Sequence, residues 1–165
     1  MIFETERLIV RKLVLNDLLP FHKMQSNPNV MQYATGEVKT LEAHEKELQQ
    51  LIEKYEIPNN DFWIYAVETK EDVTFIGTVA IVKDGDDDEI GYRFLEAFWQ
   101  KGYATEICGA LLIYCKSIGI KKLVGYVVDV NIASAKILDR FHFVPVRKFI
   151  SKDIGLPETK YELIL

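Results

Sequence analysis

Short runs of apolar and β-branched residues, separated by turn-forming residues, predict a series of β-strands along this chain. The first is the run Leu-Ile-Val-Arg-Lys-Leu at 8–13. The others lie at 62–68, 74–82, 89–95, 123–128, 144–150 and 161–165. Apolar residues at helical spacing predict helices over 18–26, 41–55 and 132–141. A further predicted helix begins in the stretch 98–106 and runs to 117. This order indicates an α/β protein with a mixed sheet, in which 89–128 forms a strand–helix–strand unit.

Residues typical of caps and turns mark the ends of these elements. Asn16-Asp17 and Thr40 precede helical segments and are favoured N-cap residues. Asn27-Pro28-Asn29 interrupts the first helical segment. Asp84-Gly85-Asp86-Asp87 separates two strand runs and predicts a hairpin turn. Gly77 lies inside a strand run, where an isolated glycine is typical of a β-bulge.

Size and charge narrow the class of protein. The chain has 165 residues, 48% hydrophobic and 27% charged, so we expect one globular domain over 1–165. The N-terminus lacks the features of a signal peptide and no apolar run is long enough to span a bilayer, so we expect a cytoplasmic protein with no membrane partner. A net charge of −5 disfavours nucleic acid as a partner and mildly favours a cationic substrate.

The cysteines and histidines offer no catalytic or metal-binding pattern. Cys108 and Cys115 lie seven residues apart in one predicted helix, which places their Cα atoms roughly 10 Å apart, too far for a disulfide. We expect reduced core thiols and no bound metal. His22, His44 and His142 show no spacing that pairs them with a Ser or Cys nucleophile, so we expect structural or surface roles.

The stretch Phe-Trp-Gln-Lys-Gly-Tyr-Ala-Thr-Glu at 98–106 carries the strongest chemical signal. It follows a predicted strand and opens a long helix. A helix N-terminus presents free N–H groups and partial positive charge, and a glycine there lets a ligand approach the backbone. In a mixed α/β sheet, ligands bind beyond the carboxyl end of a strand that feeds a helix. The stretch therefore predicts an anion site, although a helix start that only needs a tight turn would look the same.

Three motifs in order resemble the GNAT superfamily of N-acetyltransferases, and its RimJ/RimL-like branch in particular. Trp99-Gln100-Lys101-Gly102-Tyr103-Ala104 resembles the acyl-CoA motif Arg/Gln-x-x-Gly-x-Gly/Ala. The opening Glu-Thr-Glu-Arg-Leu-Ile-Val-Arg at 4–11 and the Asn-Ile-Ala-Ser-Ala-Lys-Ile-Leu-Asp run at 131–139 resemble motifs of that branch. The resemblance covers nearly the whole chain. It implies the GNAT-like acyl-CoA N-acyltransferase fold, a central, mostly antiparallel sheet with helices on both faces.

The chain departs from the family pattern at three positions. Gln100 replaces a common loop glycine, Glu96 stands where a proline is frequent, and His142 replaces the glycine before Phe143. None of these changes removes a backbone N–H from the loop. We expect Glu96 to point to water, since a carboxylate opposes an anion site, and His142 to adopt a turn conformation that glycine reaches at lower cost.

The resemblance implies which residues bind acetyl-CoA, the acyl-donor cosubstrate. Backbone N–H groups of the loop would bind the pyrophosphate, with Lys101 adding charge. The freed backbone groups of Phe94, at the end of a strand splayed from 123–128, would pair with the pantetheine arm and hold the thioester oxygen. Asn131 would contact that arm, or act as an N-cap, and Ser134 would reach the cofactor or its own helix. The implied residues are Phe94, Leu95, Gln100, Lys101, Gly102, Tyr103, Ala104, Thr105, Asn131 and Ser134.

Candidates for proton transfer lie on the two predicted strands beside the motif. A base helps to deprotonate a primary amine, and Asp88 or Glu89 could serve, although only one of them can face the site because strand side chains alternate. Turn charges in water are the ordinary alternative for both. Many GNAT members use a Tyr seven residues after the Asn to protonate the leaving thiolate, and this chain has Leu138 there. Tyr126 or solvent could take that role.

The sequence thus favours an N-acetyltransferase that moves an acetyl group from acetyl-CoA to a primary amine, either a protein N-terminal α-amine or a small amine or amino acid. A non-catalytic acyl-CoA-binding module of the same fold is the alternative, and an ATP- or flavin-binding protein is disfavoured by the absence of the matching glycine motifs. We expect the 27–40 connection, with Met31, Tyr33 and Gly36, to shape the acceptor pocket. Exposed edges of the final strands could support a homodimer.

Overall fold

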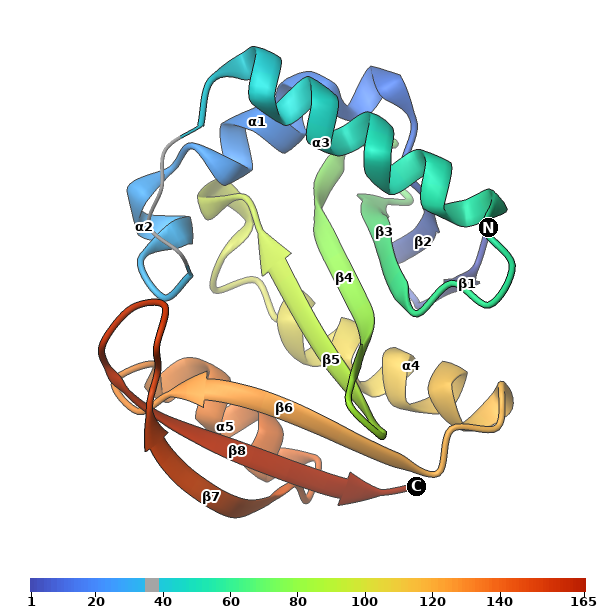
Figure 1. The fold of residues 1–165 in the computed structure, drawn as a ribbon. Coiled ribbons are helices and arrows are strands. Elements are labelled where there is room, and N and C mark those ends of the chain that lie inside the picture. Colours follow the sequence, from blue (N-terminus) through green and yellow to red (C-terminus); the bar gives the residue numbers. More distant parts are fainter. Residues whose placement is uncertain (35–38) are drawn as a thin grey trace.

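The computed structural model describes residues 1–34 and 39–165, and its centre is a mixed eight-stranded sheet (Figure 1). The strand order is β1-β2-β3-β4-β5-β6-β8-β7. All neighbouring pairs are antiparallel except β5 and β6, which are parallel. The strands are β1 Phe3–Glu4, β2 Leu8–Lys12, β3 Phe62–Thr69, β4 Phe75–Asp84, β5 Asp87–Phe94, β6 Lys122–Val128, β7 Val144–Ile150 and β8 Pro157–Ile164. The expected α/β class and mostly antiparallel sheet are confirmed.

Helices cover both faces of this sheet, as expected. They are α1 Leu18–Gln25, α2 Pro28–Met31, α3 Leu41–Glu53, α4 Tyr103–Ser117 and α5 Ile132–Arg140, with 3₁₀ turns at Leu15–Asp17, Lys54–Glu56 and Glu96–Phe98. Side chains alternate along β3: Ile64 and Ala66 pack with residues of α1 and α3, whereas Tyr65 and Val67 pack in a cluster with Ile107 of α4. No helix in the described ranges has the length and apolar character needed to cross a bilayer.

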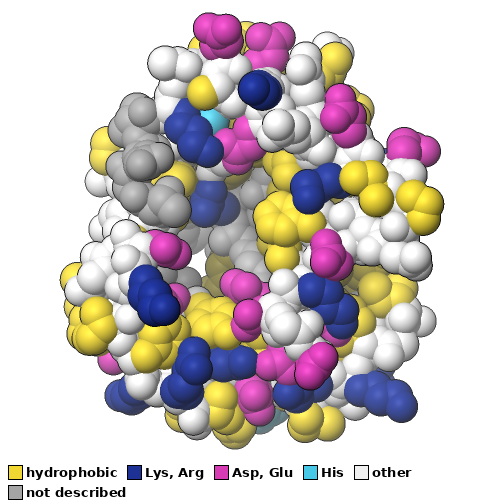
Figure 2. Space-filling model, viewed as in Figure 1, with side chains coloured by type: hydrophobic (Ala, Val, Ile, Leu, Met, Phe, Trp, Pro, Cys, Tyr) yellow, Lys and Arg dark blue, Asp and Glu magenta, His cyan; other side chains and the backbone are white. Residues whose placement is uncertain are grey.

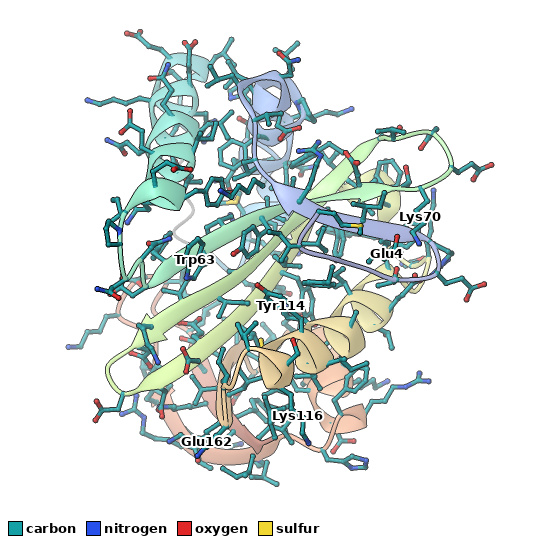
Figure 3. The ribbon with its side chains drawn as sticks, turned by 90° about the vertical axis from the view of Figure 1, so that its right-hand side faces the viewer. Glu4, Trp63, Lys70, Tyr114, Lys116 and Glu162 are labelled. Carbon is teal, nitrogen blue, oxygen red and sulfur yellow. The ribbon has the colours of Figure 1, made fainter. Side chains whose placement is uncertain are left out.

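Two short elements, β1 and α2, and an early start of β8 account for the main differences from the expected order. β1 has two residues, and an ion pair between Glu4 and Lys70 at 2.9 Å ties it to the turn after β3 (Figure 3). Asn27-Pro28-Asn29 does end α1, but it also starts α2, because Asn27 accepts the N–H of Asn29 and Pro28 occupies the first helical position. β8 begins at Pro157, four residues before the expected strand.

A β-bulge interrupts the pairing of β3 with β4 where the sequence predicted one. Val67 pairs with Gly77 and Glu68 pairs with Phe75, so Ile76 is the extra residue. A Cβ on Gly77 would clash with the carbonyl oxygen of Arg93 on β5. The bulge therefore requires glycine for close backbone approach, and it lies directly beside the end of β5.

Both cysteines are buried free thiols, as expected. The histidine expectation needs a correction: Ser26 Oγ lies 3.2 Å from His22 Nδ1, and His22 Nδ1 lies 2.7 Å from Nδ1 of the buried His44. The Ser–His spacing of four residues on a helix was the signal that sequence reasoning passed over. The cluster joins α1 to α3, and none of its three residues lines either cavity described below.

Candidate active site

β5 and β6 separate after a very short ladder. Only Asp88 with Leu123 and Glu89 with Val124 are paired, although both strands continue for several residues (Figure 1). The gap forms a cleft of about 970 Å³, lined by 89–94 of β5 and 125–128 of β6. Figure 2 shows it as a hollow in this face of the molecule. The splay expected from the family resemblance is therefore present.

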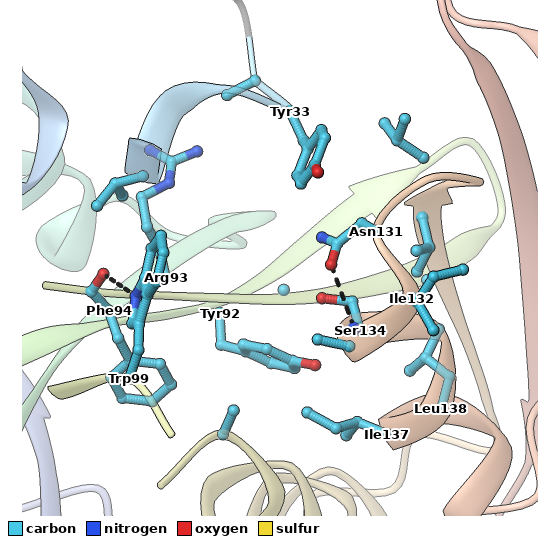
Figure 4. Close-up of a pocket in the computed structure, with 18 of the residues that line it drawn as sticks. Tyr33, Tyr92, Arg93, Phe94, Trp99, Asn131, Ile132, Ser134, Ile137 and Leu138 are labelled. Atoms are coloured by element: carbon cyan, nitrogen blue, oxygen red, sulfur yellow. Dashed lines mark hydrogen bonds between the residues drawn. The ribbon is translucent and has the colours of Figure 1, made fainter. Parts of the chain in front are cut away.

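The unpaired edge of β5 presents backbone groups to this gap. Leu95 N–H donates to the Ile76 carbonyl of β4 at 2.9 Å. Because backbone groups of successive strand residues point to opposite sides, the N–H and carbonyl of Phe94 point toward the gap. The Phe94 carbonyl accepts the indole N–H of Trp99 at 2.9 Å (Figure 4), so the Phe94 N–H is the group that faces the cleft ready to donate. Trp99 thus occupies the Phe94 carbonyl, one of the two backbone groups that the family resemblance assigned to the pantetheine arm.

The loop before α4 has the backbone of an anion cradle. Gly102 is the N-cap residue of α4 with φ of 81°, and Gln100 also lies in the left-handed region at 60°. A 15-residue helix follows, whose N-terminus concentrates positive partial charge at this loop. The loop and first-turn residues that line the cleft are Gln100, Gly102, Tyr103, Ala104 and Thr105.

The N-terminal segment fixes this loop in place. Glu106, in the first turn of α4, accepts the Arg7 backbone N–H at 2.9 Å and pairs with its guanidinium at 2.6 Å. Thr5 Oγ1 also donates to Glu106, and Arg7 Nη1 donates to the Lys101 carbonyl at 3.0 Å. The Glu-Thr-Glu-Arg opening of the chain therefore holds the cradle in shape.

Two of the expected cofactor-binding side chains lie outside the cleft. Leu95 is buried among residues of α1 and α3. Lys101 lies over the ring of Phe98, with Nζ 5.0 Å from the centroid. Neither residue lines the cavity. The Leu95 side chain packs with residues of α1 and α3, and the Lys101 side chain lies against Phe98 while its carbonyl accepts from Arg7.

The departures from the family pattern have local explanations. Asn27 and Asn29 donate to the Glu96 carboxylate at 2.7 and 2.9 Å, so it faces α2 rather than the anion loop. These hydrogen bonds, led by the one from Asn27, lower the pKa of Glu96. The sequence suggested that Glu96 would point to water, whereas its carboxylate accepts hydrogen bonds from two asparagines. Gln100 and His142 adopt φ of 60° and 65°, the strained region that glycine enters at lower cost.

α5 contributes the opposite wall. Asn131 Oδ1 accepts the Ser134 N–H at 3.3 Å, so Asn131 is the N-cap of α5, and both residues also line the cleft. The two interpretations of Asn131 are thus compatible. Tyr92 on β5 reaches across toward Ser134 (Figure 4), and burial raises the pKa of Tyr92 to about 12. The phenol is therefore un-ionised at neutral pH.

Of the paired carboxylates, Glu89 faces the cleft. Burial, followed by the charges of Asp84 and Glu158, raises the pKa of Glu89, whereas Lys160 opposes that shift. Asp88 pairs with Lys83 at 2.8 Å and does not line the cavity, so the structure brings Glu89 and not Asp88 to the cleft. Because successive strand side chains point to opposite faces, only one of the two could face the cleft, and that residue is Glu89.

Tyr126 lines the cleft, but its hydroxyl is engaged. It donates to Asp84 Oδ2. Burial first, and then this hydrogen bond, raises the pKa of Tyr126. A phenol whose proton is held by a carboxylate is a weak acid, so the geometry gives little support to a proton-donor role.

Sequence reasoning missed three polar residues of the cleft. Tyr92 and Arg93 were counted only as members of a strand run, and Glu158 precedes the strand expected at 161–165. Only Arg93 left a signal, as a lone charge in an otherwise apolar strand end. Within 1–34 and 39–165, no group of three or more His, Cys, Asp or Glu residues could hold a metal ion.

Comparisons with known proteins agree with this architecture. The chain matches the model of the acetyltransferase (GNAT) domain over residues 7–144. The uncharacterized N-acetyltransferase YoaA of Bacillus subtilis (strain 168) is 28% identical over 145 residues, covering 86% of this chain and 82% of that protein.

Two solved structures illustrate how widely the fold is shared. A GNAT-family acetyltransferase from Bacillus anthracis has a TM-score of 0.85 at 21% identity, covering 98% of this chain and 96% of that chain. RimL, a ribosomal L7/L12 alpha-N-protein acetyltransferase in complex with coenzyme A, has a TM-score of 0.80 at 18% identity, covering 99% and 97%. At these identities the likeness concerns the fold alone.

The family match spans most of the chain and includes the splayed strands, the glycine cradle and the helix that follows it. This chain therefore belongs to the GNAT acetyltransferase family and is an acetyl-CoA-dependent N-acetyltransferase.

Proposed function

We propose that the protein acetylates a primary amine, either the α-amine of a protein N-terminus or a small amine or amino acid, by direct attack on the thioester of acetyl-CoA. The observation that carries this proposal is the open edge of β5, which leads from the Gly102 loop into a cleft containing Glu89. Direct transfer needs both substrates in line, and a gap between two strands admits them from opposite ends.

The residues present suit acetyl-CoA. The loop from Gln100 to Thr105 at the N-terminus of α4 would bind the pyrophosphate through backbone N–H groups. The N–H of Phe94, pointing into the gap, would pair with the pantetheine arm or hold the thioester oxygen as charge develops on it. Asn131 and Ser134 form the facing wall. RimL, solved with coenzyme A, has the same fold and supports this use of the cleft.

Glu89 is the general base in this proposal. An amine must lose its proton to attack, and an alkyl ammonium has a pKa of about 10.4. A carboxylate with a raised pKa is a stronger base than an exposed one, and burial raises the pKa of Glu89. It receives the proton directly or through one water as the nitrogen bonds to the acetyl carbon and the thiolate leaves.

The leaving thiolate takes its proton from solvent or from Tyr126. Leu138 occupies the position where many family members have tyrosine, and it is buried. Because Tyr126 already donates to Asp84, we favour solvent. A thiol pKa of about 8.5 makes protonation by water at neutral pH feasible.

We also propose that the chain belongs to the RimJ/RimL-like branch. Its Glu-Thr-Glu-Arg opening fixes the cofactor loop through Glu106, and its Asn131-x-x-Ser134 motif caps α5 at the cleft. Both motifs therefore have a structural reason to occur together. The fold of RimL supports the same assignment.

The test couples binding to turnover. Thermal unfolding would be measured with acetyl-CoA, CoA, ATP and FMN, and thiol release would then be followed with N-terminal peptides, small amines and amino acids. A ligand at 100 times its Kd adds about 2.7 kcal/mol of stability. We expect stabilisation by acetyl-CoA and CoA alone, and thiol release with one acceptor class. Stabilisation without release from any amine would overturn the catalytic proposal and favour a binding module.

A further inference from the structure

Arg93 occupies an unusual position among the charged residues of the cleft. It is the second-to-last residue of β5, and it lines both the large cleft and a smaller cavity of about 330 Å³ bounded by residues of α1 and α3. Figure 4 places its guanidinium on the side of the cleft toward α2 and Tyr33, away from the anion loop. Arg93 therefore lies on the acceptor side and not at the cofactor cradle.

Among the described residues, Arg93 bonds directly to a neutral side chain only, and the charge of Glu47 acts on it from farther away. Arg93 Nη1 donates to the side-chain oxygen of Gln25, a neutral group. Gln25 in turn donates to Glu47 at 3.2 Å, and Lys39 pairs with Glu47 at 2.9 Å. Within 1–34 and 39–165 no carboxylate forms an ion pair with Arg93.

A second partly buried arginine shows what a purely structural role looks like. Arg11 pairs with Asp17 at 2.8 Å and with Glu68 at 2.6 Å. Those carboxylates raise the pKa of Arg11, whereas burial lowers the pKa of Arg93 against the opposing charge of Glu47. A guanidinium removed from water without a directly bonded counter-ion costs free energy, and Glu47 is already paired with Lys39, so the retention of Arg93 favours an anion that completes the site.

The described contacts of Arg93 leave part of its hydrogen-bonding capacity unused. A guanidinium carries five N–H donors, and the described contacts of Arg93 use one Nη. No fully buried side-chain nitrogen or oxygen in the described ranges lacks a hydrogen-bond partner. The remaining N–H groups of Arg93 are therefore not sealed from solvent, and Arg93 lines both cavities. Their planar arrangement matches a carboxylate.

The cleft has the opposite charge at its other end. Glu89 lies on the same face of β5, four residues before Arg93, and Glu158 of β8 also lines the cavity. Four residues of strand span about 13 Å between Cα atoms, and both side chains line the same cleft. One molecule can therefore place an ammonium near the carboxylates and an anion at Arg93.

We propose that Arg93 binds a carboxylate of the acceptor, so that the preferred substrates are amines whose molecule also carries a carboxylate. The carboxylate comes either from a free amino acid or from an acidic side chain near a peptide N-terminus. This inference rests on the proposed function, because it names the acceptor of the same site. It revises the simple expectation of a cationic substrate: the acceptor is zwitterionic.

The experiment compares acceptors in matched pairs. One pair is a free amino acid and its carboxamide; the other is a short peptide with glutamate at its second position and the same peptide with glutamine. We expect kcat/KM to be at least about tenfold higher for the carboxylate member of one pair, mainly through KM, since a charged hydrogen-bonded pair contributes that much. The responding pair identifies the source of the carboxylate.

Variants then assign the preference to Arg93. We expect Arg93→Gln to reduce the kcat/KM ratio between the two members of the responding pair to less than about threefold, with KM for acetyl-CoA unchanged. Arg93→Lys should restore part of that ratio. Arg147→Gln on β7 is the control, because Arg147 lies over the ring of Phe149 outside the cleft. A merely structural role for Arg93 would lower activity on both members of a pair equally.

Binding separates this inference from the catalytic proposal. Isothermal titration with CoA present would measure the same acceptor pairs without turnover. Tighter binding of a carboxylate member, lost in Arg93→Gln, supports the Arg93 site even if no amine is acetylated. Equal affinity and equal kcat/KM within both pairs would overturn the Arg93 inference while leaving N-acetyltransferase activity intact.

Discussion

The two sides of the cleft are built from different materials. The cofactor side consists of backbone: the loop at Gln100 and Gly102, the start of α4 and the unpaired edge of β5. The proposed acceptor side consists of charged side chains, chiefly Glu89 and Arg93 of β5 and Glu158 of β8. Backbone recognition requires a particular glycine and helix start and so leaves a contiguous motif. Side-chain recognition leaves isolated residues, and it is the side on which specificity can change without disturbing the fold.

The largest effect is expected on the acceptor side, at Glu89. Glu89→Gln should lower kcat by about 10²- to 10⁴-fold for any amine that the wild type acetylates, because the general base is lost. Steady-state thiol release at saturating acetyl-CoA measures this. In the wild type, activity should fall as pH decreases through the raised pKa of Glu89, since the base must be deprotonated.

Asp88→Asn is the matched control for that variant. Asp88 pairs with Lys83 outside the cleft, so kcat should change by less than about threefold. Similar losses in both variants would mean that the acidic edge of β5 acts through its overall charge and that Glu89 has no special role.

On the cofactor side, the sharpest test is Gly102→Ala. Forcing a left-handed backbone on alanine costs about 1–2 kcal/mol and should distort the cradle, raising the Kd of acetyl-CoA about tenfold. Gly119→Ala carries the same kind of strain at φ of 89° beyond the other end of α4 and lies outside the cleft. It should lose similar stability without weakening acetyl-CoA binding. Equal Kd values for the two variants would contradict backbone recognition at the loop.

A smaller effect concerns the packing behind Arg93, where α1 meets α3. Burial lowers the pKa of His44, with Glu47 opposing and the nearby charges of His22 and Lys39 assisting. The unfolded chain then binds protons that the folded chain resists, so the free energy of unfolding should decline as pH falls below about 6.5. Urea unfolding at pH 7.5 and 5.5 measures it. His44→Leu should flatten that dependence; an unchanged slope would exclude His44 as its source.

The smallest effect is expected at Tyr126. Because its hydroxyl already donates to Asp84, Tyr126→Phe should reduce kcat by less than about threefold. A loss of 100-fold or more, with KM unchanged, would reverse our preference and assign Tyr126 as the donor of the thiol proton.

The sequence was most informative where local chemistry determines structure. The glycine at the start of α4, the bulge at Gly77 and the cap at Asn131 each leave a signature because a specific backbone conformation needs a specific residue. The beginning of β8 was missed because Pro-Glu-Thr-Lys is a poor strand sequence, and pairing with β6 and β7 stabilises it instead. α2 was missed because four residues carry no periodicity.

The acceptor side was harder to predict for a related reason. Glu89 emerged only as one of two neighbours, since strand phase decides which of them enters the cleft. Arg93 and Glu158 line one cleft from β5 and β8, which are far apart in sequence and are separated by β6 in the sheet. Of the segment expected to shape the acceptor pocket, Tyr33 lines the cleft, Met31 does not, and Gly36 falls outside the described residues.

The short ladder between β5 and β6 makes the sheet two laminae joined at one end. β1 to β5 form one, and β6, β8 and β7 form the other, connected through two residue pairs and through the packing of α4 and α5. An extended ligand that bonds to the edge of β5 takes the place of a missing strand. Amide hydrogens at the open end of β5 should therefore exchange with solvent far more slowly once that place is filled, and the two laminae should then unfold as one cooperative unit.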